Sequence, residues 1–173
     1  KVIEDLALDT GLMWDKISEF SKMLKSFEGS VSHKAGEAQS EELKKQYPLK
    51  QHIEGGLYTR ELFMKEGSII ISMIHKQKHP SFLLKGKVSY LTDKGEVDTI
   101  TAPHTVFTQE GAQRVFYVHE DTQWCCVYKT DATSFEEAEA DVYVDDYRDL
   151  PEETIEKIKT CENFIYHFWN EKN

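Results

Sequence analysis

The sequence predicts a mainly β fold, an antiparallel β-sandwich or barrel with an α-helix at each end of the chain. Between residues 55 and 130, short runs of β-branched and aromatic residues alternate with turn signals at near-regular spacing, which is typical of such sheets. No helical pattern separates these runs, and this excludes a doubly wound α/β sheet. The 173 residues fit one domain that can bury a sizeable core.

The N-terminal helix is expected because apolar residues recur at steps of four and three, which places them on one helix face. These residues are Met13, Ile17, Phe20, Leu24 and Phe27. Asp9 or Thr10 would cap the first N–H groups of this helix, and Gly29 follows its last turn. Residues 28–50 are polar and predict a linker with one helical turn at Glu41–Lys45.

Seven strands are expected in a central β-domain, which the sequence places at residues 51–130, after the helix and linker of residues 1–50. They cover Leu57–Met64, Ser68–His75, Ser81–Thr92, Glu96–Thr101, Val106–Gln109, Arg114–His119 and Gln123–Lys129. Turn signals separate the strands at Glu66-Gly67, Lys78-His79-Pro80, Asp93-Lys94-Gly95, Glu110-Gly111 and Glu120-Asp121.

Residues 131–173 are expected to form a connector followed by a C-terminal helix. Pro151 followed by Glu152 and Glu153 is typical of a helix start, because proline fits the first turn and acids favour it. The apolar face of this helix would contain Ile155, Ile158, Ile165 and Phe168. The connector is expected to be mostly solvated, but three apolar residues predict a part that packs as an added strand: Val142, Val144 and Tyr147.

The net charge of −10 belongs to one segment of the chain. Residues 131–156 contain eleven acidic residues and Arg148 as their one basic residue, so the remaining residues balance. A net acidic chain without a basic stripe disfavours nucleic acid and anionic membranes as partners.

The three cysteines show no metal-binding or disulfide pattern, since Cys125 and Cys126 are adjacent and Cys161 stands alone. A reducing compartment is the simplest interpretation, and we expect a cytoplasmic location. The longest apolar run, Ile69 to Ile74, is too short to span a bilayer.

Most of the expected chemistry lies between Gly67 and Gly86. A strand ends at His75, a short turn follows, and His79 stands seven residues before Gly86. This segment resembles the first motif of the cupin superfamily, in which a strand ends in His-x-His and a Glu stands seven residues before a second Gly. His79 occupies the Glu position and His75 the second His position, whereas Met73 replaces the first His.

A second segment, Glu110 to Arg114, is similar to the Gly-x-x-His end of the second cupin motif, with Arg114 at the position of the third metal His. The resemblance covers residues 55–130 and implies a cupin-type jelly roll. A narrower set of motifs looks like small bacteriophage-encoded cupins of mostly unassigned role: Tyr58-Thr59-Arg60-Glu61, Ile74-His75-Lys76, Ala102-Pro103-His104-Thr105-Val106-Phe107 and Glu120-Asp121-Thr122-Gln123-Trp124. Those proteins commonly place a His four residues after the Trp, where this chain has Tyr128.

The cupin resemblance implies a divalent metal, for which Fe, Mn, Ni and Zn all suit imidazole and oxygen ligands. His75 and His79 would be ligands, and the third would be His104, Tyr128, Glu61 or water. On a straight strand the two histidines would lie about 13 Å apart, so sharing an ion requires that the chain reverses between them. The alternative of equal weight is a remnant site without metal. His104 also fits an ordinary edge histidine.

Arg114 would place a permanent cation where the resemblance implies a metal ligand. It would repel a metal there and could hold the carboxylate or phosphate of a small anionic ligand, with Tyr128 and Glu61 as further ligand-binding candidates. The alternative is an ion pair between Arg114 and Glu61 or another acid inside the barrel.

Three functions follow from the sequence, which does not decide whether the chain is an enzyme. The first is a phage-related binding or assembly module with a degenerate metal site, in the host cytoplasm or a virion, whose apolar helix stripes favour a homo-oligomer or larger assembly. The second is a metal-dependent small-molecule enzyme that uses His75 and His79. The third is a metal-free sugar-nucleotide isomerase or epimerase, with His79, Glu61 and Tyr128 as acid–base groups.

Overall fold

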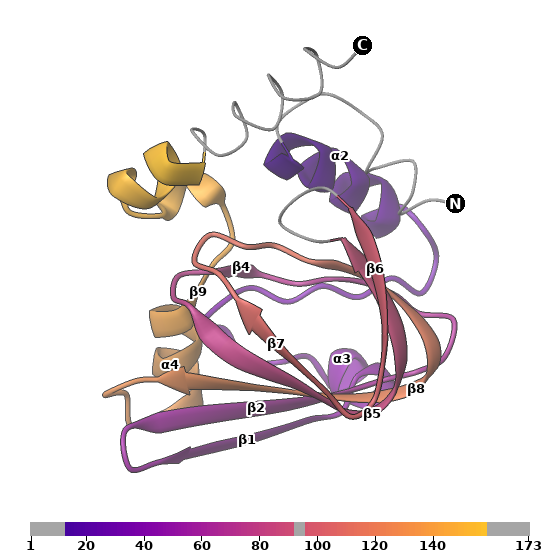
Figure 1. Cartoon of the computed structure of the whole chain (residues 1–173), viewed down its shortest axis with the longest axis horizontal. Helices are drawn as coiled ribbons and strands as arrows, with labels where there is room; N and C mark the ends of the chain where they lie inside the picture. Colours follow the sequence, from indigo (N-terminus) through magenta and orange to yellow (C-terminus); the bar gives the residue numbers. More distant parts are fainter. Residues whose placement is uncertain (1–12, 92–95, 159–173) are drawn as a thin grey trace.

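A computed structural model describes residues 13–91 and 96–158 of the chain (Figure 1). Its strands are β1 Leu49–Glu54, β2 Leu57–Met64, β3 Ile69–Ile71, β4 Ile74–His75, β5 His79–Leu91, β6 Val97–Thr101, β7 His104–Thr108, β8 Val115–Lys129 and β9 Tyr143–Val144. Its helices are α2 Met13–Lys25, α3 Glu41–Gln46, α4 Phe135–Val142 and the 3₁₀ turn η1 Tyr147–Asp149. Residues 152–158 are also helical.

The long strands β5 and β8 pair with each other and connect the rest of the sheet, because each also pairs with two further strands along its length. β8 pairs with β3 near its start and with β2 near its end, while β5 pairs with β7 and then with β6. All of these pairs are antiparallel, and the order β1-β2-β8-β5-β6 defines the main sheet. Since partners change at the bend, β2 and β6 lie on opposite sides of a curved sheet (Figure 1).

Gly86 occupies the bend of β5, where the register against β8 shifts. Its φ of +89° lies in the left-handed region, which favours glycine. A Cβ at this position would meet the backbone oxygen of Asp121 at 2.6 Å. The bend therefore requires a residue without a side chain.

The main core fills the barrel and consists largely of aromatic and aliphatic side chains, among them Leu83, Val88, Phe116 and Trp124. A second cluster joins α2 to the sheet, because Ile17 and Phe20 pack with Leu91 and Val115. α2 thus lies across one end of the barrel (Figure 1).

The acidic connector continues the barrel with α4 and β9. The helix begins at Ser134, whose side chain accepts a hydrogen bond from the Glu137 N–H, and it buries Ala138 and Val142. β9 follows directly and pairs antiparallel with β4. This small sheet places the connector against the interior of the barrel.

The predicted fold class is confirmed, since an antiparallel sheet forms a barrel with helices outside it. The helical turn near residues 41–45 and the added strand in the connector are also present. In the part of the chain that the structure describes, no helix has the length and apolar character needed to cross a membrane.

Four local expectations need correction. Glu120-Asp121 is not a turn between two strands, because β8 continues through it. Residues 68–75 contain two short strands instead of one, and the end of the expected linker forms β1. Part of the connector is the helix α4 instead of solvated loop. The predicted caps Asp9 and Thr10, the turn 93–95, Cys161 and the apolar residues Ile165 and Phe168 lie outside the described residues.

Candidate functional site

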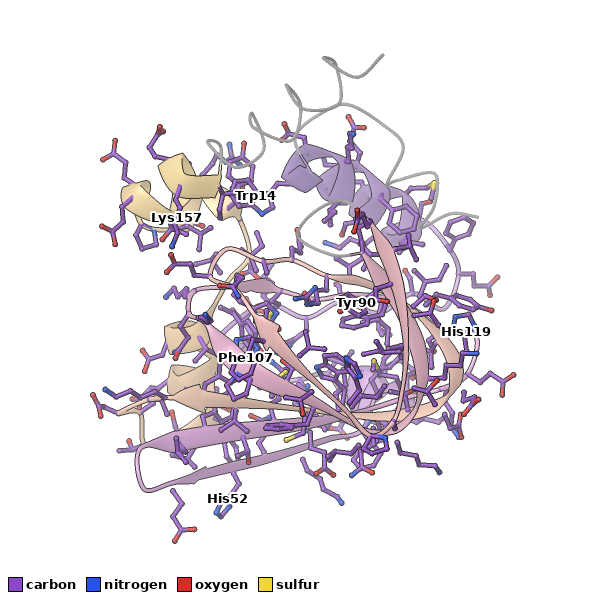
Figure 2. The ribbon with its side chains drawn as sticks, viewed as in Figure 1. Trp14, His52, Tyr90, Phe107, His119 and Lys157 are labelled. Atoms are coloured by element: carbon purple, nitrogen blue, oxygen red, sulfur yellow. The ribbon has the colours of Figure 1, made fainter. Side chains whose placement is uncertain are left out.

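Strand alternation gathers polar side chains inside the barrel. Arg60 of β2 stands opposite Cys126 of β8, which stands opposite Ser81 of β5. The neighbouring inward row contains Tyr58 and Tyr128, which are also paired. Since side chains alternate between faces along a strand, these residues share the interior face. Figure 2 shows the interior filled with side chains, with Tyr90 inside the barrel and His52 pointing away from it.

His75 and His79 meet inside the barrel, as the cupin resemblance requires. Their ring centroids lie 4.6 Å apart, and the two residues are 5% and 2% exposed. The backbone N–H of His75 donates to the Ala112 carbonyl oxygen, and the His75 carbonyl oxygen accepts from the Gly111 N–H, which holds β4 in place; the chain bends after it at Lys76 and Gln77. The chain then turns and enters β5 at His79.

Both imidazoles are neutral at pH 7. The Nδ1–H of His79 donates to the Gln77 carbonyl oxygen at 3.0 Å, which leaves Nε2 as a buried acceptor without a hydrogen-bond partner among the described residues. Burial lowers the pKa of His79 to about 4, and the charge of Arg114 adds to this effect. Burial also lowers the pKa of His75 well below its usual value, aided by His79, Arg114 and Arg60. The site therefore presents lone pairs in an electropositive environment.

Two tyrosine hydroxyls join the histidine pair. The Tyr128 and Tyr143 oxygens lie 2.6 Å apart, and the Tyr128 oxygen lies 3.3 Å from His75 Nδ1. Burial raises the pKa of both phenols, that of Tyr143 to about 12, so they remain protonated. Tyr143 was not among the predicted site residues, although it lies between Val142 and Val144, two of the three apolar residues that predicted the added strand.

A buried charged group lies beside the tyrosines. Arg60 Nη1 lies 3.3 Å from Glu139 Oε1, while Glu139 Oε2 lies 2.7 Å from His33 Nε2. The guanidinium of Arg60 also lies over the Tyr143 ring at 5.2 Å. Arg60 comes from β2, Glu139 from α4 and His33 from the segment between α2 and α3, and none of the three was predicted as a site residue.

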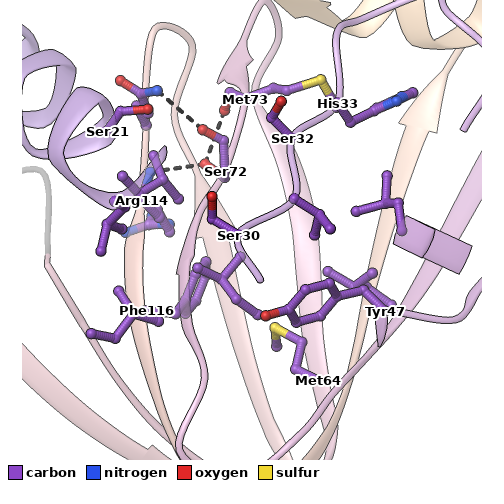
Figure 3. Close-up of a pocket in the computed structure, with 18 of the residues that line it drawn as sticks. Ser21, Ser30, Ser32, His33, Tyr47, Met64, Ser72, Met73, Arg114 and Phe116 are labelled. Atoms are coloured by element: carbon purple, nitrogen blue, oxygen red, sulfur yellow. Dashed lines mark hydrogen bonds between the residues drawn. The ribbon is translucent and has the colours of Figure 1, made fainter. Parts of the chain in front are cut away.

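Arg114 points inward, as the sequence predicts. The residue is 3% exposed, and its guanidinium lies 4.8 Å from the centre of the Tyr90 ring. Its backbone N–H donates to Ser72 Oγ at 2.9 Å, which fixes the start of β8 beside the preceding loop (Figure 3). The position that the resemblance assigns to a metal ligand thus holds a buried cation.

The structure does not bring Glu61 to this cluster. Glu61 follows the inward-facing Arg60 and therefore points to the other face of β2, where it accepts a hydrogen bond from Gln123 at 2.7 Å. It also lies 3.6 Å from Lys50. Glu61 is therefore not placed to pair with Arg114 inside the barrel, and the buried acid Glu139 pairs with Arg60.

The structure also separates His104 from the histidine pair. His104 is exposed and stands opposite Leu83, whereas His79 stands opposite Thr108 at the other end of β7. Four strand residues correspond to about 13 Å, which is too far for a shared ion. His104 is therefore an edge histidine in this structure.

A cavity of about 800 Å³ connects these groups with the N-terminal segment. Its barrel side includes Arg60, His75, Arg114, Phe116, Trp124 and Tyr143. Its other side is formed by the segment around residues 28–34, including Ser30, Ser32 and His33 (Figure 3). A small molecule in this cavity would therefore meet Arg60, His75, Arg114 and Tyr143, whereas His79 and Tyr128 do not line it.

The fit to a divalent metal is incomplete. Two neutral imidazoles are present, and the Nδ1–H bond of His79 to a backbone carbonyl is the arrangement that orients metal-binding histidines. Within residues 13–91 and 96–158, however, no three His, Cys, Asp or Glu side chains form a group that could hold an ion. A metal here would need Tyr128 or water as a further ligand.

No family model matches the sequence, and no curated protein matches it. Among solved structures, the chain is similar to the Cupin_2 domain of an XRE family transcriptional regulator from Enterobacter cloacae, with 10% identity, 50% of this chain and 99% of that chain covered, and a TM-score of 0.43. It is also similar to the EutQ protein of Clostridium difficile, with 15% identity, 50% of this chain and 70% of that chain covered, and a TM-score of 0.42. The third similar structure is ectoine synthase from P. lautus, with 10% identity, 62% of this chain and 73% of that chain covered, and a TM-score of 0.44. With TM-scores below 0.5, these likenesses do not assign a family or a function to the chain.

Proposed function

We propose that this chain is a non-enzymatic binding module with a cupin-like barrel, whose cavity takes a small anionic ligand at Arg114. The observation that carries the proposal is the buried guanidinium of Arg114 in the cavity wall. A guanidinium has five N–H donors in its plane, so it can bind a carboxylate while it stacks on Tyr90. Lys25, Lys34 and Arg60 also line the cavity and favour an anion, whereas Glu28 and Asp145 of the lining oppose it.

The test is ligand binding by the full chain, measured by thermal shift and isothermal titration calorimetry with carboxylates, phosphates and neutral analogues. Anions should raise the melting temperature, and Arg114→Met should abolish this effect. Lys65→Met is the matched control, because Lys65 is an exposed cation outside the cavity. Equal shifts in wild type and Arg114→Met, or no shift with any anion, would contradict the proposal.

The relation to bacteriophage proteins and a role in a homo-oligomer or larger assembly belong to this proposal as well. The sequence motifs support the first. The exposed side chains of Met23 and Phe27 near the end of α2 are consistent with the second. Size-exclusion chromatography with light scattering tests self-association, and a monomer at all concentrations would contradict it.

A metal-dependent enzyme is the second candidate, favoured by the buried lone pair on His79 Nε2. His75 and His79 would hold Fe, Mn, Ni or Zn, with Tyr128 or water completing the ligands, and the ion would supply Lewis-acid chemistry. The cations Arg60 and Arg114 oppose it. Elemental analysis of reconstituted protein tests this candidate: near-stoichiometric metal that His79→Ala removes would support it, and trace metal would contradict it.

A further inference from the structure

β1 is an edge strand of the main sheet, because β2 pairs with one of its sides and no described strand pairs with the other (Figure 1). Within the described residues, no other segment forms a backbone hydrogen bond to this outer edge either. An open edge presents N–H and C=O groups that can pair with another strand, and natural sheets protect it with proline, a bulge, a very short strand or lysine. β1 has six residues in unbroken register with β2, contains no proline, and has Lys50 as its one lysine.

The exposed face of β1 has a basic residue near its start and an acidic residue at its end. Lys50, His52 and Glu54 alternate on this face, and their side chains are 75%, 67% and 79% exposed. His52 points away from the barrel (Figure 2). Gln51 and Ile53 are half-buried on the interior face. Since the opposite charges lie at equal distances from His52, the strand is complementary to a second copy of itself in antiparallel orientation.

The geometry of an antiparallel pair limits the registers in which two copies of β1 can meet. Every second residue directs its backbone groups to the free edge, so a two-fold axis has to pass beside a residue. An axis at Gln51 places Lys50 opposite the partner's His52, and an axis at Ile53 leaves Lys50 without an acid. An axis at His52 places Lys50 opposite the partner's Glu54, and Glu54 opposite the partner's Lys50. Opposite charges at directly opposing positions stabilise strand pairing, so this register is favoured.

The contacts that these side chains make within one chain leave them available for a partner. Lys50 Nζ lies 3.6 Å from Glu61 Oε1, and His52 Nε2 lies 2.9 Å from Glu54 Oε2. Exposed contacts of this kind hold long side chains only weakly. A carboxylate has two oxygens and an ammonium has three donors, so Lys50 and Glu54 can each bind a partner without losing these contacts.

We propose that two copies of this chain pair through β1 in the register centred on His52, so that their main sheets join into one continuous antiparallel sheet. The interface is isologous, since the same strand serves both copies. It contains two contacts of Lys50 with Glu54 and one of His52 with the partner's His52. This inference rests on the self-association included in the proposed function, and it names the surface, which is β1 instead of α2.

The experiment is sedimentation equilibrium of the full chain and of charge-reversed variants. The wild type should dimerise. Lys50→Glu and Glu54→Lys should each raise the dissociation constant of the dimer at least about tenfold, because each replaces two attractions with two repulsions. Lys65→Glu is the matched control, since Lys65 is an exposed lysine outside β1 and its reversal should leave the dimer unchanged. Glu54→Lys also keeps the contact of Lys50 with Glu61, so it tests the interface if Lys50→Glu disturbs the folding of β1.

An equimolar mixture of the two single variants tests the register itself. Each variant offers the other two pairs of opposite charge, so the mixture should dimerise although neither variant does so alone. The double variant Lys50→Glu/Glu54→Lys should also dimerise like the wild type, because it exchanges the two charges.

Three results would overturn the inference. A dimer that neither single variant weakens would place self-association on another surface, such as α2. Single variants that are monomeric but recover in neither the mixture nor the double variant would exclude this register. A wild type that is monomeric at all concentrations would remove self-association from the proposed function as well, whereas anion binding at Arg114 is measured independently of it.

Discussion

The buried contact of Glu139 with Arg60 and His33 should be a major determinant of stability. The side chains of Glu139 and Arg60 are only 3% and 11% exposed, so little water can replace a lost partner. Glu139→Gln keeps the shape of the side chain but leaves the Arg60 cation buried without a counter-charge. Breaking a buried pair in this way costs about 3–5 kcal/mol. The slight exposure of Arg60 favours the lower end, about 3 kcal/mol.

Urea unfolding followed by tryptophan fluorescence measures this change in the free energy of unfolding. Asp121→Asn is the control, because Asp121 pairs with the exposed Lys65 and such surface pairs contribute about 1 kcal/mol or less. The double variant Arg60→Met/Glu139→Leu should recover much of the loss, since it removes both charges together. A loss below about 1 kcal/mol in Glu139→Gln, equal to that of the control, would refute the assignment of a buried ion pair.

Three further changes test other parts of the structure. Gly86→Ala should lower the free energy of unfolding by about 2 kcal/mol or more in urea titrations, because a left-handed φ and a clash with the backbone combine at this position. Gly55→Ala is the control, since Gly55 also has a left-handed φ but open space around it, and it should lose only about 1 kcal/mol. Equal losses would contradict the clash. Because the pKa of His79 is lowered to about 4 in the folded protein, the unfolded state binds more protons at this residue between about pH 6.5 and pH 4. The contribution of His79 to stability should therefore fall as the pH drops through that window, by at most about 1.4 kcal/mol per pH unit, and the lowered pKa of His75 adds to the fall. His79→Asn should show a shallower fall in unfolding midpoints at pH 6.5, 5.5 and 4.5, and an identical fall would argue against this assignment. Tyr128→Phe removes the hydroxyl that contacts Tyr143 and should cost about 1–3 kcal/mol of stability by thermal and urea unfolding, while a neutral effect would mean that water satisfies the remaining groups.

Local patterns in the sequence were enough to predict the β-barrel, whereas the meeting of its two histidines was implied only by the cupin resemblance. Period-two apolar runs mark strands, and the glycine at position 86 marks the bend of β5. A reversal of the chain between His75 and His79 was expected only as the condition for a shared ion. Alternation along β2 could also have shown that Glu61 points outward, because its neighbour Arg60 points inward.

The rest of the site depends on contacts between distant parts of the chain. Glu139 and Tyr143 lie in an acidic segment whose composition suggests a solvated connector, and only the docking of α4 and β9 brings them to Arg60 and Tyr128. Sequence alternation predicts which face a residue occupies, but not which residue on another element it meets. His104 shows the same limit, since its place on β7 is set by the register with β5.

Glu139 and Tyr143 follow the last strand of the main sheet, so they are synthesised after it, and this affects how the barrel is completed during synthesis. The sheet is complete when Lys129 has left the ribosome, yet at that stage Arg60 has no counter-charge from Glu139 and Tyr128 lacks its contact with Tyr143. Until the connector emerges and docks, the interior of the nascent barrel therefore lacks the negative charge of Glu139 and the hydroxyl of Tyr143. A chain cut after residue 130 would contain every strand of the main sheet and should still be markedly less stable than the longer chain.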